Sequence, residues 1–456
     1  MIKFGTDGWR AVIADEFTFD NVKTVAQAFS DNFSGLNKSA VIGYDNRFLS
    51  SKFAYAAAEV LSGNGIEVFL CDKSCPTPAV SMHVVEKGAA AGIMITASHN
   101  PAKWNGFKIK ESFGCSSSPE TTKKVEALIG KNIPKEADDS KISLFDPKEA
   151  YLNKVRAFVD LELISLSKIK IICDTMHGSG TGYLKDALSG AAEVIEINGN
   201  IDPAFAGINP EPIEKNLSLL LKTCRQTRLS GVALDGDADR IAACGSDGVF
   251  INTHQVFALL MYHLVENKKM KGDVVKTFNI SRLIERMAAK YGLKLHETPI
   301  GFKYIAELMI NGDVLIGGEE SGGMGIKGHL PERDGVLAGL ILTELMAFKK
   351  KSLDKILEDI SKEYGYFYYD RLDLHLSDDK KNSVIEMLKN DPPKELAGLA
   401  VKEILCLDGT KLILDDGSWI LFRASGTEPL LRIYCEAASK DKVDRLIGEG
   451  QKLALK

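Results

Sequence analysis

The chain of 456 residues is long enough for three or four domains, and its hydrophobic content of 45% is ample for their cores. The formal net charge of −5 excludes the basic surface that nucleic-acid-binding proteins present. No apolar run is long enough to span a bilayer, and the N-terminus lacks the apolar core of a signal peptide. The eight cysteines occur without a CxxC pair, which is typical of reduced thiols in the cytoplasm.

The N-terminal stretch 4–10, FGTDGWR, is rich in turn-forming residues around one arginine. Taken alone, it predicts an ordinary loop. Arg10 becomes a candidate for anion binding only if other anion-binding loops converge on it.

Beyond this loop, a strand–helix–strand–helix–strand pattern occurs three times. Apolar stretches of strand length alternate with stretches of helical period, which predicts βαβ crossovers and largely parallel sheets. The expected strands are 39–44, 66–71 and 90–95 in the first copy, 169–173, 193–197 and 231–234 in the second, and 273–278, 293–297 and 313–316 in the third. The expected helices between them include 53–62, 181–189 and 282–290.

From about Gly365 the pattern changes. Residues 378–389 and 440–455 have helical period, and 401–414 and 419–422 have the character of strands around Asp-Gly turns. This segment predicts a small α+β domain of a different kind.

In the first copy, an apolar run ends abruptly in TASHNP, residues 96–101, which predicts a doubly buried strand followed by a fixed turn. Ser98 then lies at the carboxyl end of a central strand, where open α/β sheets bind ligands. Ser98 lacks the G-x-S-x-G context of an acyl-transfer nucleophile, and in extended backbone the side chain of His99 points the other way. A serine that carries phosphate is one interpretation, and a polar loop without chemistry is the other.

In the second copy, the third strand is followed by DGDADR, residues 235–240. Residues two apart in extended backbone share a face, so Asp235, Asp237 and Asp239 can converge, and they repel one another unless a cation lies among them. Carboxylate ligands suit magnesium or calcium rather than zinc, and the calcium-loop pattern fails at its sixth and twelfth positions. The alternative is an acidic solvated turn.

A phosphate on Ser98 would supply a further oxygen ligand to such a magnesium ion, together with a charge of about −1.5 to −2. With three carboxylates, this charge exceeds that of one divalent cation, so basic residues are required nearby. Arg240, Lys108 and Arg10 are the candidates. The metal would act as a Lewis acid on the phosphoryl group as it transfers.

Two further loops carry polar groups. The third copy ends in GGEESGG, residues 317–323, where the carboxylate of Glu319 and the hydroxyl of Ser321 suit hydrogen bonds to sugar hydroxyls; a Gly-rich turn is the alternative. In the last domain, RASGTEP at 423–429 combines backbone N–H groups, hydroxyls and the Arg423 guanidinium into a nest for an anion, with Arg432 nearby. A surface turn is the alternative for this second loop.

The motifs TASHNP, DGDADR, GEESGG and RASGTEP, in this order after an FGTDG opening, resemble the signature loops of the α-D-phosphohexomutase superfamily, and the resemblance covers the whole chain. It implies three related α/β domains with mixed, largely parallel sheets and a small C-terminal α+β domain around a central cleft. The expected domains are 1–145, 146–252, 253–366 and 367–456. The implied reaction moves phosphate between the 1- and 6-positions of a hexose, through a phosphoserine and a hexose 1,6-bisphosphate.

The resemblance also implies roles for individual residues. The expected catalytic residues are Ser98 as the phosphoserine, His99, Lys108, Arg10 and Lys303; the expected Mg²⁺ ligands are Ser98, Asp235, Asp237 and Asp239; and the expected substrate-binding residues are Arg240, Glu319, Ser321, Arg423, Ser425, Gly426 and Thr427, with Arg432 beside them.

The third loop bears on which sugar is used. Mannose/glucose mutases of the superfamily often have GEMSGH there and glucosamine mutases GEQSGH, whereas this chain has Glu320 and Gly323 at the variable positions. The Glu-Glu-Ser run resembles glucomutases, as does TPIGFK at 298–303, whose Lys303 matches a catalytic-site lysine. We therefore expect a phosphoglucomutase that uses Mg²⁺ and glucose 1,6-bisphosphate. The alternatives are a phosphomannomutase, a phosphoglucosamine mutase, and a sugar-phosphate-binding protein without activity.

The expected partner is a hexose phosphate, with no nucleic acid and no membrane. The expected state is a cytoplasmic monomer or weak homodimer.

Overall fold

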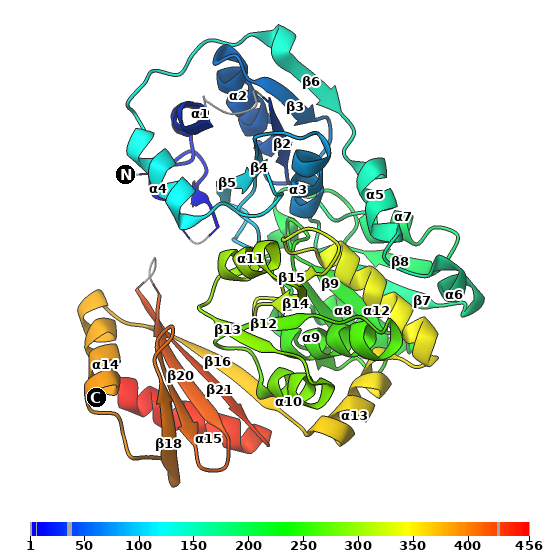
Figure 1. Cartoon of the computed structure of the whole chain (residues 1–456), viewed down its shortest axis with the longest axis vertical. Helices are drawn as coiled ribbons and strands as arrows, with labels where there is room; N and C mark the ends of the chain where they lie inside the picture. Colours follow the sequence, from blue (N-terminus) through cyan, green and yellow to red (C-terminus); the bar gives the residue numbers. More distant parts are fainter. Residues whose placement is uncertain (1, 6, 34–38, 426–428, 456) are drawn as a thin grey trace. The chain divides into compact units, whose positions relative to one another are not determined.

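The structure is a computed structural model that describes residues 2–5, 7–33, 39–425 and 429–455 (Figure 1). The chain forms two compact units. The larger unit is Met1–Val274 with Gly301–Leu357, and the smaller is Val275–Ile300 with Glu358–Lys456. Within the part of the chain that is described, no helix is both long enough and apolar enough to cross a membrane.

The first sheet of the larger unit has six strands in the order β1-β5-β4-β2-β3-β6. Its strands from β4 to β6 run parallel, and β5 and β1 add to the β4 edge in antiparallel orientation. Every residue of β4 is buried, as its apolar run predicts. The strands are β1 (Trp9–Val12), β2 (Ser39–Tyr44), β3 (Glu67–Cys71), β4 (Ala91–Ile95), β5 (Trp104–Glu111) and β6 (Ile142–Phe145).

Helices cover both faces of this sheet. One face shares its apolar core with α1 and α2. On the other face, α3 lies close because two strand positions are glycine: a Cβ on Gly43 would meet Val80 Cγ2 at 2.3 Å, and one on Gly92 would meet Val84 Cγ2 at 2.5 Å. The helices are α1 (Phe19–Phe33), α2 (Ser50–Gly63), α3 (Thr77–Glu86) and α4 (Pro119–Leu128).

The second sheet has five strands in the order β11-β10-β9-β7-β8. Its strands β8, β7 and β9 are parallel, and β10 and β11 are antiparallel additions. The strands are β7 (Lys170–Asp174), β8 (Glu193–Ile197), β9 (Gly231–Leu234), β10 (Ile241–Cys244) and β11 (Phe250–Ile251). The helices are α5 (Lys148–Arg156), α6 (Leu161–Leu166), α7 (Tyr183–Ala187), α8 (Ser218–Thr227) and α9 (Thr253–Tyr262).

The third copy adds an antiparallel pair to the larger unit, β14 (Val314–Gly318) with β15 (Met324–Ile326). The same step therefore occurs three times: β4, β9 and β14 are each followed by a polar loop and an antiparallel strand. Two helices of this unit flank the pair in sequence, α11 (Phe302–Asn311) and α12 (Gly335–Lys349), and Asp334 caps α12 by accepting a hydrogen bond from Leu337 N. The predicted repeat places its three polar loops at equivalent positions.

The smaller unit contains an antiparallel sheet in the order β16-β21-β20-β19-β18-β17. Side chains of α14 and α15 share a core with one face of it, and Phe278 packs with Trp419, Leu421 and Tyr434 of the other face. The elements are α10 (Arg282–Tyr291), β13 (Leu295–Thr298), β16 (Tyr368–His375), α14 (Asp378–Asn390), β17 (Glu395–Leu396), β18 (Leu399–Leu405), β19 (Thr410–Leu414), β20 (Trp419–Ala424), β21 (Leu430–Ala437) and α15 (Lys440–Leu455).

Two elements pass from one unit to the other, β12 (Asp273–Thr277) and α13 (Leu353–Tyr364). The sequence pattern did not predict that residues 275–300 belong to the same compact unit as the C-terminal sheet. It also did not predict the antiparallel strands that follow β4, β9 and β14, which are β5, β10 and β15. Two lysines of β5, Lys108 and Lys110, are fully buried and paired with carboxylates distant in sequence, so the strand has no apolar pattern to detect.

Candidate active site

Ser98 lies just beyond the end of β4 and is fully buried. Its φ of +53° is in the left-handed region, where residues other than glycine are uncommon. The backbone N–H of Ser98 donates to Thr96 Oγ1 at 2.8 Å, and Ser98 Oγ donates to Asp235 Oδ2 at 3.0 Å. The hydroxyl of TASHNP therefore faces the aspartates of DGDADR, across a long separation in sequence.

The three aspartates converge as their alternation predicts. Asp235, Asp237 and Asp239 are fully buried, and each offers an oxygen within 4.8 Å of the others. Asp237 Oδ1 and Asp239 Oδ1 are buried and accept no hydrogen bond from any described residue. Buried oxygens without donors fit a bound cation, and a set made only of carboxylates suits Mg²⁺ better than Zn²⁺.

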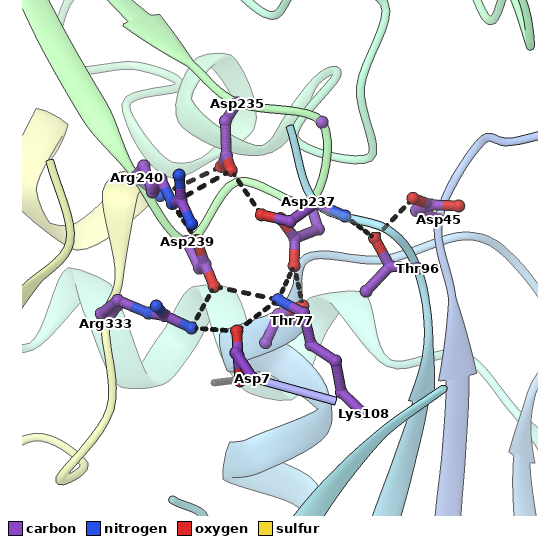
Figure 2. A network of polar contacts seen from close by, with 12 residues as sticks. Asp7, Asp45, Thr77, Thr96, Lys108, Asp235, Asp237, Asp239, Arg240 and Arg333 are labelled. Carbon is purple, nitrogen blue, oxygen red and sulfur yellow. Dashed lines mark hydrogen bonds and ion pairs between the residues drawn. The ribbon is translucent and has the colours of Figure 1, made fainter. Parts of the chain in front are cut away.

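Basic side chains surround this cluster (Figure 2). Lys108 Nζ lies 2.7 Å from Asp237 Oδ2 and 3.3 Å from Asp239 Oδ2. Arg333 Nη2 lies 2.9 Å from Asp239 Oδ2, and Arg240 Nε lies 3.6 Å from Asp239 Oδ1. Lys108 and Arg240 are two of the cations that the charge argument predicted, and Arg333 is an addition.

Other residues of the cluster were missed at the level of sequence. Asp7 Oδ2 lies 3.0 Å from Lys108 Nζ and 2.6 Å from Arg333 Nη2, and Thr77 Oγ1 donates to Asp237 Oδ2 at 2.5 Å. Asp7 belongs to the FGTDGWR opening, in which the sequence indicates only Arg10 as a candidate. Arg333 precedes α12 in the sequence PERDG, and no local pattern distinguishes it from a solvated arginine.

Burial and neighbouring charges shift the pKa values of Asp235, Asp237 and Lys108, and the direction of the shift differs from one residue to the next. Burial raises the pKa of Asp235, and the charges of Asp237 and Asp239 raise it further. Burial also acts to raise the pKa of Asp237, but the charge and hydrogen bond of Lys108 bring it below its ordinary value. Burial acts to lower the pKa of Lys108, but Asp237, Asp239 and Asp7 together raise it. The lysine is thus a permanent cation, and the raised pKa of Asp235 shows that this carboxylate still lacks a stabilising positive charge, as expected at a cation site.

Arg10 lies beside the serine loop, and His99 is part of that loop. Arg10 is on β1 and its Nη1 donates to Asn100 Oδ1 at 2.6 Å. Burial, and then the charges of Arg240 and Arg10, lower the pKa of His99 well below its ordinary value. His99 is therefore a neutral imidazole at pH 7 and does not act as a counter-charge.

The GGEESGG loop lies against the aspartate loop. Ile241 N donates to Gly322 O at 3.1 Å, and Arg333 Nη1 donates to Glu319 Oε2 at 3.3 Å. A Cβ on Gly323 would meet Arg333 Cδ at 2.1 Å. The histidine of the GEMSGH and GEQSGH patterns therefore does not fit at position 323 while Arg333 occupies this place.

Two residues expected near the sugar have fewer contacts. Ser321 Oγ is buried without a hydrogen-bond partner among the described residues. Lys303 is on the first turn of α11, and its Nζ lies 5.2 Å from the centroid of the Tyr304 ring. Burial lowers the pKa of Lys303, while the charge of Asp7 opposes that shift.

The smaller unit holds the residues expected to bind the substrate's other phosphate. Arg423 Nε donates to Asp408 Oδ1 at 3.0 Å, and Asp408 Oδ2 accepts from Ile300 N at 2.9 Å. Arg423 and Arg432 are directly opposite on β20 and β21. Beyond them, Ser425 N donates to Leu430 O at 2.8 Å. Residues 426–428, and with them the predicted Gly426 and Thr427, lie outside the described residues.

Comparison with known proteins gives consistent results along the whole chain. Profiles of phosphoglucomutase/phosphomannomutase α/β/α domains I, II and III match residues 1–136, 149–248 and 252–364, and the profile of the C-terminal domain matches 381–449. The predicted fold class, three α/β domains followed by a different C-terminal domain, is confirmed.

Individual relatives match over nearly their full length. A probable phosphoglucosamine mutase of Methanosphaera stadtmanae is 32% identical over 97% of this chain and 96% of its own. A phosphoglucomutase/phosphomannomutase of Thermococcus kodakarensis is 31% identical over 99% and 98%. The crystal structure of a protein described as a phosphomannomutase from Thermus thermophilus has a TM-score of 0.90 and 37% identity, and covers 100% of this chain and 99% of its own.

Proposed function

Because the chain belongs to the phosphoglucomutase/phosphomannomutase family and is thus a phosphohexomutase, an intramolecular phosphotransferase, we propose that it interconverts glucose 1-phosphate and glucose 6-phosphate. Phosphate passes from Ser98 to the sugar, which gives glucose 1,6-bisphosphate, and the other phosphate of this intermediate returns to Ser98. The observation that carries the proposal is the Ser98 hydroxyl, 3.0 Å from Asp235 Oδ2 in a fully buried cluster of carboxylates and cations.

Asp235, Asp237 and Asp239 would hold Mg²⁺ together with an oxygen of the Ser98 phosphate, because their carboxylates converge and Asp237 Oδ1 and Asp239 Oδ1 are buried and accept no hydrogen bond from a described residue. When bound, the ion supplies Lewis-acid polarisation of the phosphoryl group. Lys108 remains charged throughout and offsets the phosphate charge that the carboxylates would otherwise repel.

Transfer breaks the bond between phosphorus and Ser98 Oγ and forms a bond from phosphorus to a sugar hydroxyl oxygen. The proton of that hydroxyl must pass to a base within hydrogen-bond reach. We assign this role to Lys303, whose pKa is lowered by burial, with the neutral imidazole of His99 as the other candidate. Arg10 and Arg240 lie beside the serine loop and its aspartates, where they can hold the phosphoryl oxygens.

Sugar recognition is assigned to the GGEESGG loop, through Glu319 and Ser321. The clash of a Cβ at Gly323 with Arg333 supports a pocket different from those of the GEMSGH and GEQSGH patterns. The choice of glucose rests on the resemblance of the Glu-Glu-Ser run to glucomutases. Arg423, Ser425 and Arg432 are assigned to the substrate's non-reacting phosphate. Glucosamine 1-phosphate is the second candidate substrate, because a relative of 32% identity is named for that activity.

We further place the protein in the cytoplasm, consistent with eight free cysteines, as a monomer or weak homodimer.

The test is a coupled assay with glucose 1-phosphate, Mg²⁺ and a trace of glucose 1,6-bisphosphate, run beside mannose and glucosamine 1-phosphates. Glucose 1-phosphate should give the highest kcat/KM. Intact mass after incubation with the bisphosphate should show one phosphate, and Ser98→Ala should lack both this phosphate and activity, by a factor of about 10⁴ or more. Ser30→Ala is the matched control, because Ser30 is a buried serine whose hydroxyl donates to Ala26 O at 2.8 Å within its own helix. Activity retained by Ser98→Ala would refute the phosphoserine.

A further inference from the structure

The Ser98 loop rests on three buried residues to which the chemistry above gives no role: Asp45, Arg47 and Thr96. Asp45 directly follows β2 and Thr96 directly follows β4, which are parallel neighbours in the first sheet. The side chains of Asp45 and Arg47 are 0% exposed, and Arg47 Nε lies 3.0 Å from Asp45 Oδ2. A buried ion pair often adds little net stability to a protein. The position of this pair beside the Ser98 loop therefore indicates that it has another role.

Arg47 binds the backbone of one short segment. Its Nη2 donates to Ser98 O at 2.6 Å and to Asn100 O at 2.7 Å, and its Nη1 donates to Pro101 O at 2.9 Å and Trp104 O at 3.0 Å. The guanidinium is planar and its donors have fixed directions, so these bonds fix the carbonyl orientations from Ser98 onward.

Thr96 fixes the other side of the serine. Thr96 Oγ1 donates to Asp45 Oδ2 at 2.6 Å (Figure 2) and accepts the backbone N–H of Ser98 at 2.8 Å. Asp45 also accepts from Ser50 Oγ at 2.8 Å, so its carboxylate is held in place as well. The amide and the carbonyl of Ser98 are thus both tied, through Thr96 and Arg47, to the same carboxylate.

Such restraint matches the conformation of Ser98. A residue with a Cβ rarely adopts a φ of +53°, and it keeps that conformation only where surrounding contacts enforce it. In this conformation the hydroxyl reaches Asp235 Oδ2. If the extended backbone of β4 continued through residue 98, the alternation of the strand would set the direction of the Ser98 side chain instead.

We propose that Asp45, Arg47 and Thr96 are positioning residues that hold Ser98 in the left-handed conformation required for phosphoryl transfer. This inference rests on the proposed role of Ser98 as the phosphoserine. The three residues act on the rate of transfer to and from Ser98 and not on the binding of the sugar phosphate.

The first test compares Thr96→Val with Thr96→Ser. Valine keeps the shape of threonine but can neither accept the Ser98 amide nor donate to Asp45, whereas serine can do both. We expect Thr96→Val to lower kcat, and the rate at which the bisphosphate phosphorylates Ser98, by about 10²-fold, the effect of a displacement of about 1 Å. KM for glucose 1-phosphate should stay within about twofold, and Thr96→Ser should recover most of the rate.

Thr343→Val is the matched control for these variants. Thr343 is fully buried in α12, and its hydroxyl donates to Gly339 O at 2.8 Å within the same helix. Thr343→Val should lower the melting temperature about as much as Thr96→Val does, but its kcat should stay close to that of the wild type. A Thr96→Val enzyme that melts earlier but phosphorylates Ser98 at the wild-type rate would overturn the proposal, because the contact would then be purely structural.

Arg47→Lys provides a second, independent test if Thr96→Val does not fold. A single ammonium cannot reach four carbonyls in the directions of the guanidinium fork, so the same loss of kcat at unchanged KM is expected. Wild-type kcat in Arg47→Lys would also overturn the proposal. Failure of the proposed function is recognised separately: wild-type protein would then take up no phosphate at Ser98, whatever the variants do.

Discussion

The candidate transfer site in the larger unit and the proposed phosphate-binding residues of the smaller unit differ in how their charges are buried and paired. Around the aspartates, the side chains of Lys108 and Asp237 are 1% and 0% exposed, and Lys108 contacts the carboxylates of Asp237, Asp239 and Asp7. In the smaller unit, the side chains of Arg423 and Asp408 are 19% and 22% exposed, and their pairing is a single contact of 3.0 Å.

This difference in the burial and pairing of charges is the one expected from the role proposed for each site. Buried charges are tolerated only when they are paired and hydrogen-bonded. Because the surroundings of such charges have a low dielectric constant, their electrostatic interactions are strong. Burial also excludes water, which would hydrolyse a phosphoenzyme. A site that binds and releases a phosphate is better partly exposed to water, because water then hydrates its charges and neither the phosphate-bound nor the empty site contains an unpaired buried charge. We therefore expect substitutions in the buried cluster to act on the rate and those in the phosphate loop to act on the affinity.

Asp237→Asn is the most direct way to break this comparison. The substitution keeps the shape of the side chain but removes one negative charge from the aspartate cluster. We expect activity at saturating glucose 1-phosphate to fall by about 10³-fold, the equivalent of several kcal/mol of transition-state stabilisation by the metal. Calorimetric titration of the protein with Mg²⁺ should show weaker binding, and a chelator should abolish wild-type activity reversibly.

Asp186→Asn is the control for Asp237→Asn, because Asp186 pairs with Lys148 and its side chain is 49% exposed. A Mg²⁺ titration of Asp237→Asn identical to that of the wild type would contradict the assignment of the metal site.

Lys303→Met tests whether the base belongs to the same buried system. Loss of an acid/base group lowers kcat by about 10²-fold or more, whereas loss of a binding charge raises KM. Burial lowers the pKa of Lys303, so the neutral amine that accepts a proton forms at a lower pH than in free lysine. Wild-type kcat/KM should therefore rise as pH increases toward this pKa, and the rise should be absent in Lys303→Met.

Lys303→Arg separates the two roles of this lysine, because arginine keeps the charge but cannot act as a base at these pH values. Full kcat in Lys303→Arg would identify Lys303 as a binding charge.

Lys411 is a buried lysine whose ion pair is long, 3.8 Å from its Nζ to Glu297 Oε1, and does not offset the effect of burial. It lies in the smaller unit at 2% exposure, its Nζ donates to Phe278 O at 2.8 Å, and burial, with the charge of Lys276, lowers its pKa to about 8. Below pH 8 the folded protein holds an unfavourable buried ammonium. Between pH 8 and 10.5 the folded state is already neutral while the unfolded chain keeps its proton, so the free energy of unfolding should rise by up to about 3 kcal/mol.

This rise is measured by denaturant unfolding at several pH values between about 7 and 10. Lys411→Met should remove this rise. If the free energy of unfolding of Lys411→Met still rises with pH as steeply as that of the wild type, another group is responsible. Lys276 serves as an internal comparison: burial acts to lower its pKa, but Glu285 and Glu297 raise it, so its contribution to stability is lost only at pH values above 10.5.

The smallest effects are expected in the phosphate loop. Arg423→Ala removes a charged hydrogen bond to phosphate, worth about 1.5–3 kcal/mol, so KM should rise roughly ten- to hundred-fold with Ser98 phosphorylation nearly unchanged. Asp408→Asn should raise KM only a few-fold, because asparagine still accepts a hydrogen bond but no longer orients the guanidinium by charge.

Asp416→Asn is the matched control, since Asp416 begins the next Asp-Gly turn of the same sheet and contacts Ser418 and Lys442 instead. A fall in kcat at constant KM for Arg423→Ala would place this arginine at the transfer site and would break the comparison between the two units.

The sequence by itself determined the elements whose signal is local. The apolar run before TASHNP predicts a strand buried on both faces, and the alternation of Asp235, Asp237 and Asp239 after another such strand predicts converging carboxylates. These predictions succeed because strand burial and side-chain alternation depend on neighbouring residues only. The need for cations around the aspartates also follows from charge alone, and it identified Lys108 correctly as one of them.

Only the tertiary structure decided which distant groups complete the site. Arg333, Asp7 and Lys108 meet at the aspartates from segments far apart in the chain, and no periodicity relates them. The left-handed conformation of Ser98 and its anchoring by Arg47 likewise depend on packing between two parallel strands, β2 and β4. The physical reason is that burying a charge is favourable only beside its partner, and the partner is set by how the strands and loops come together in the fold.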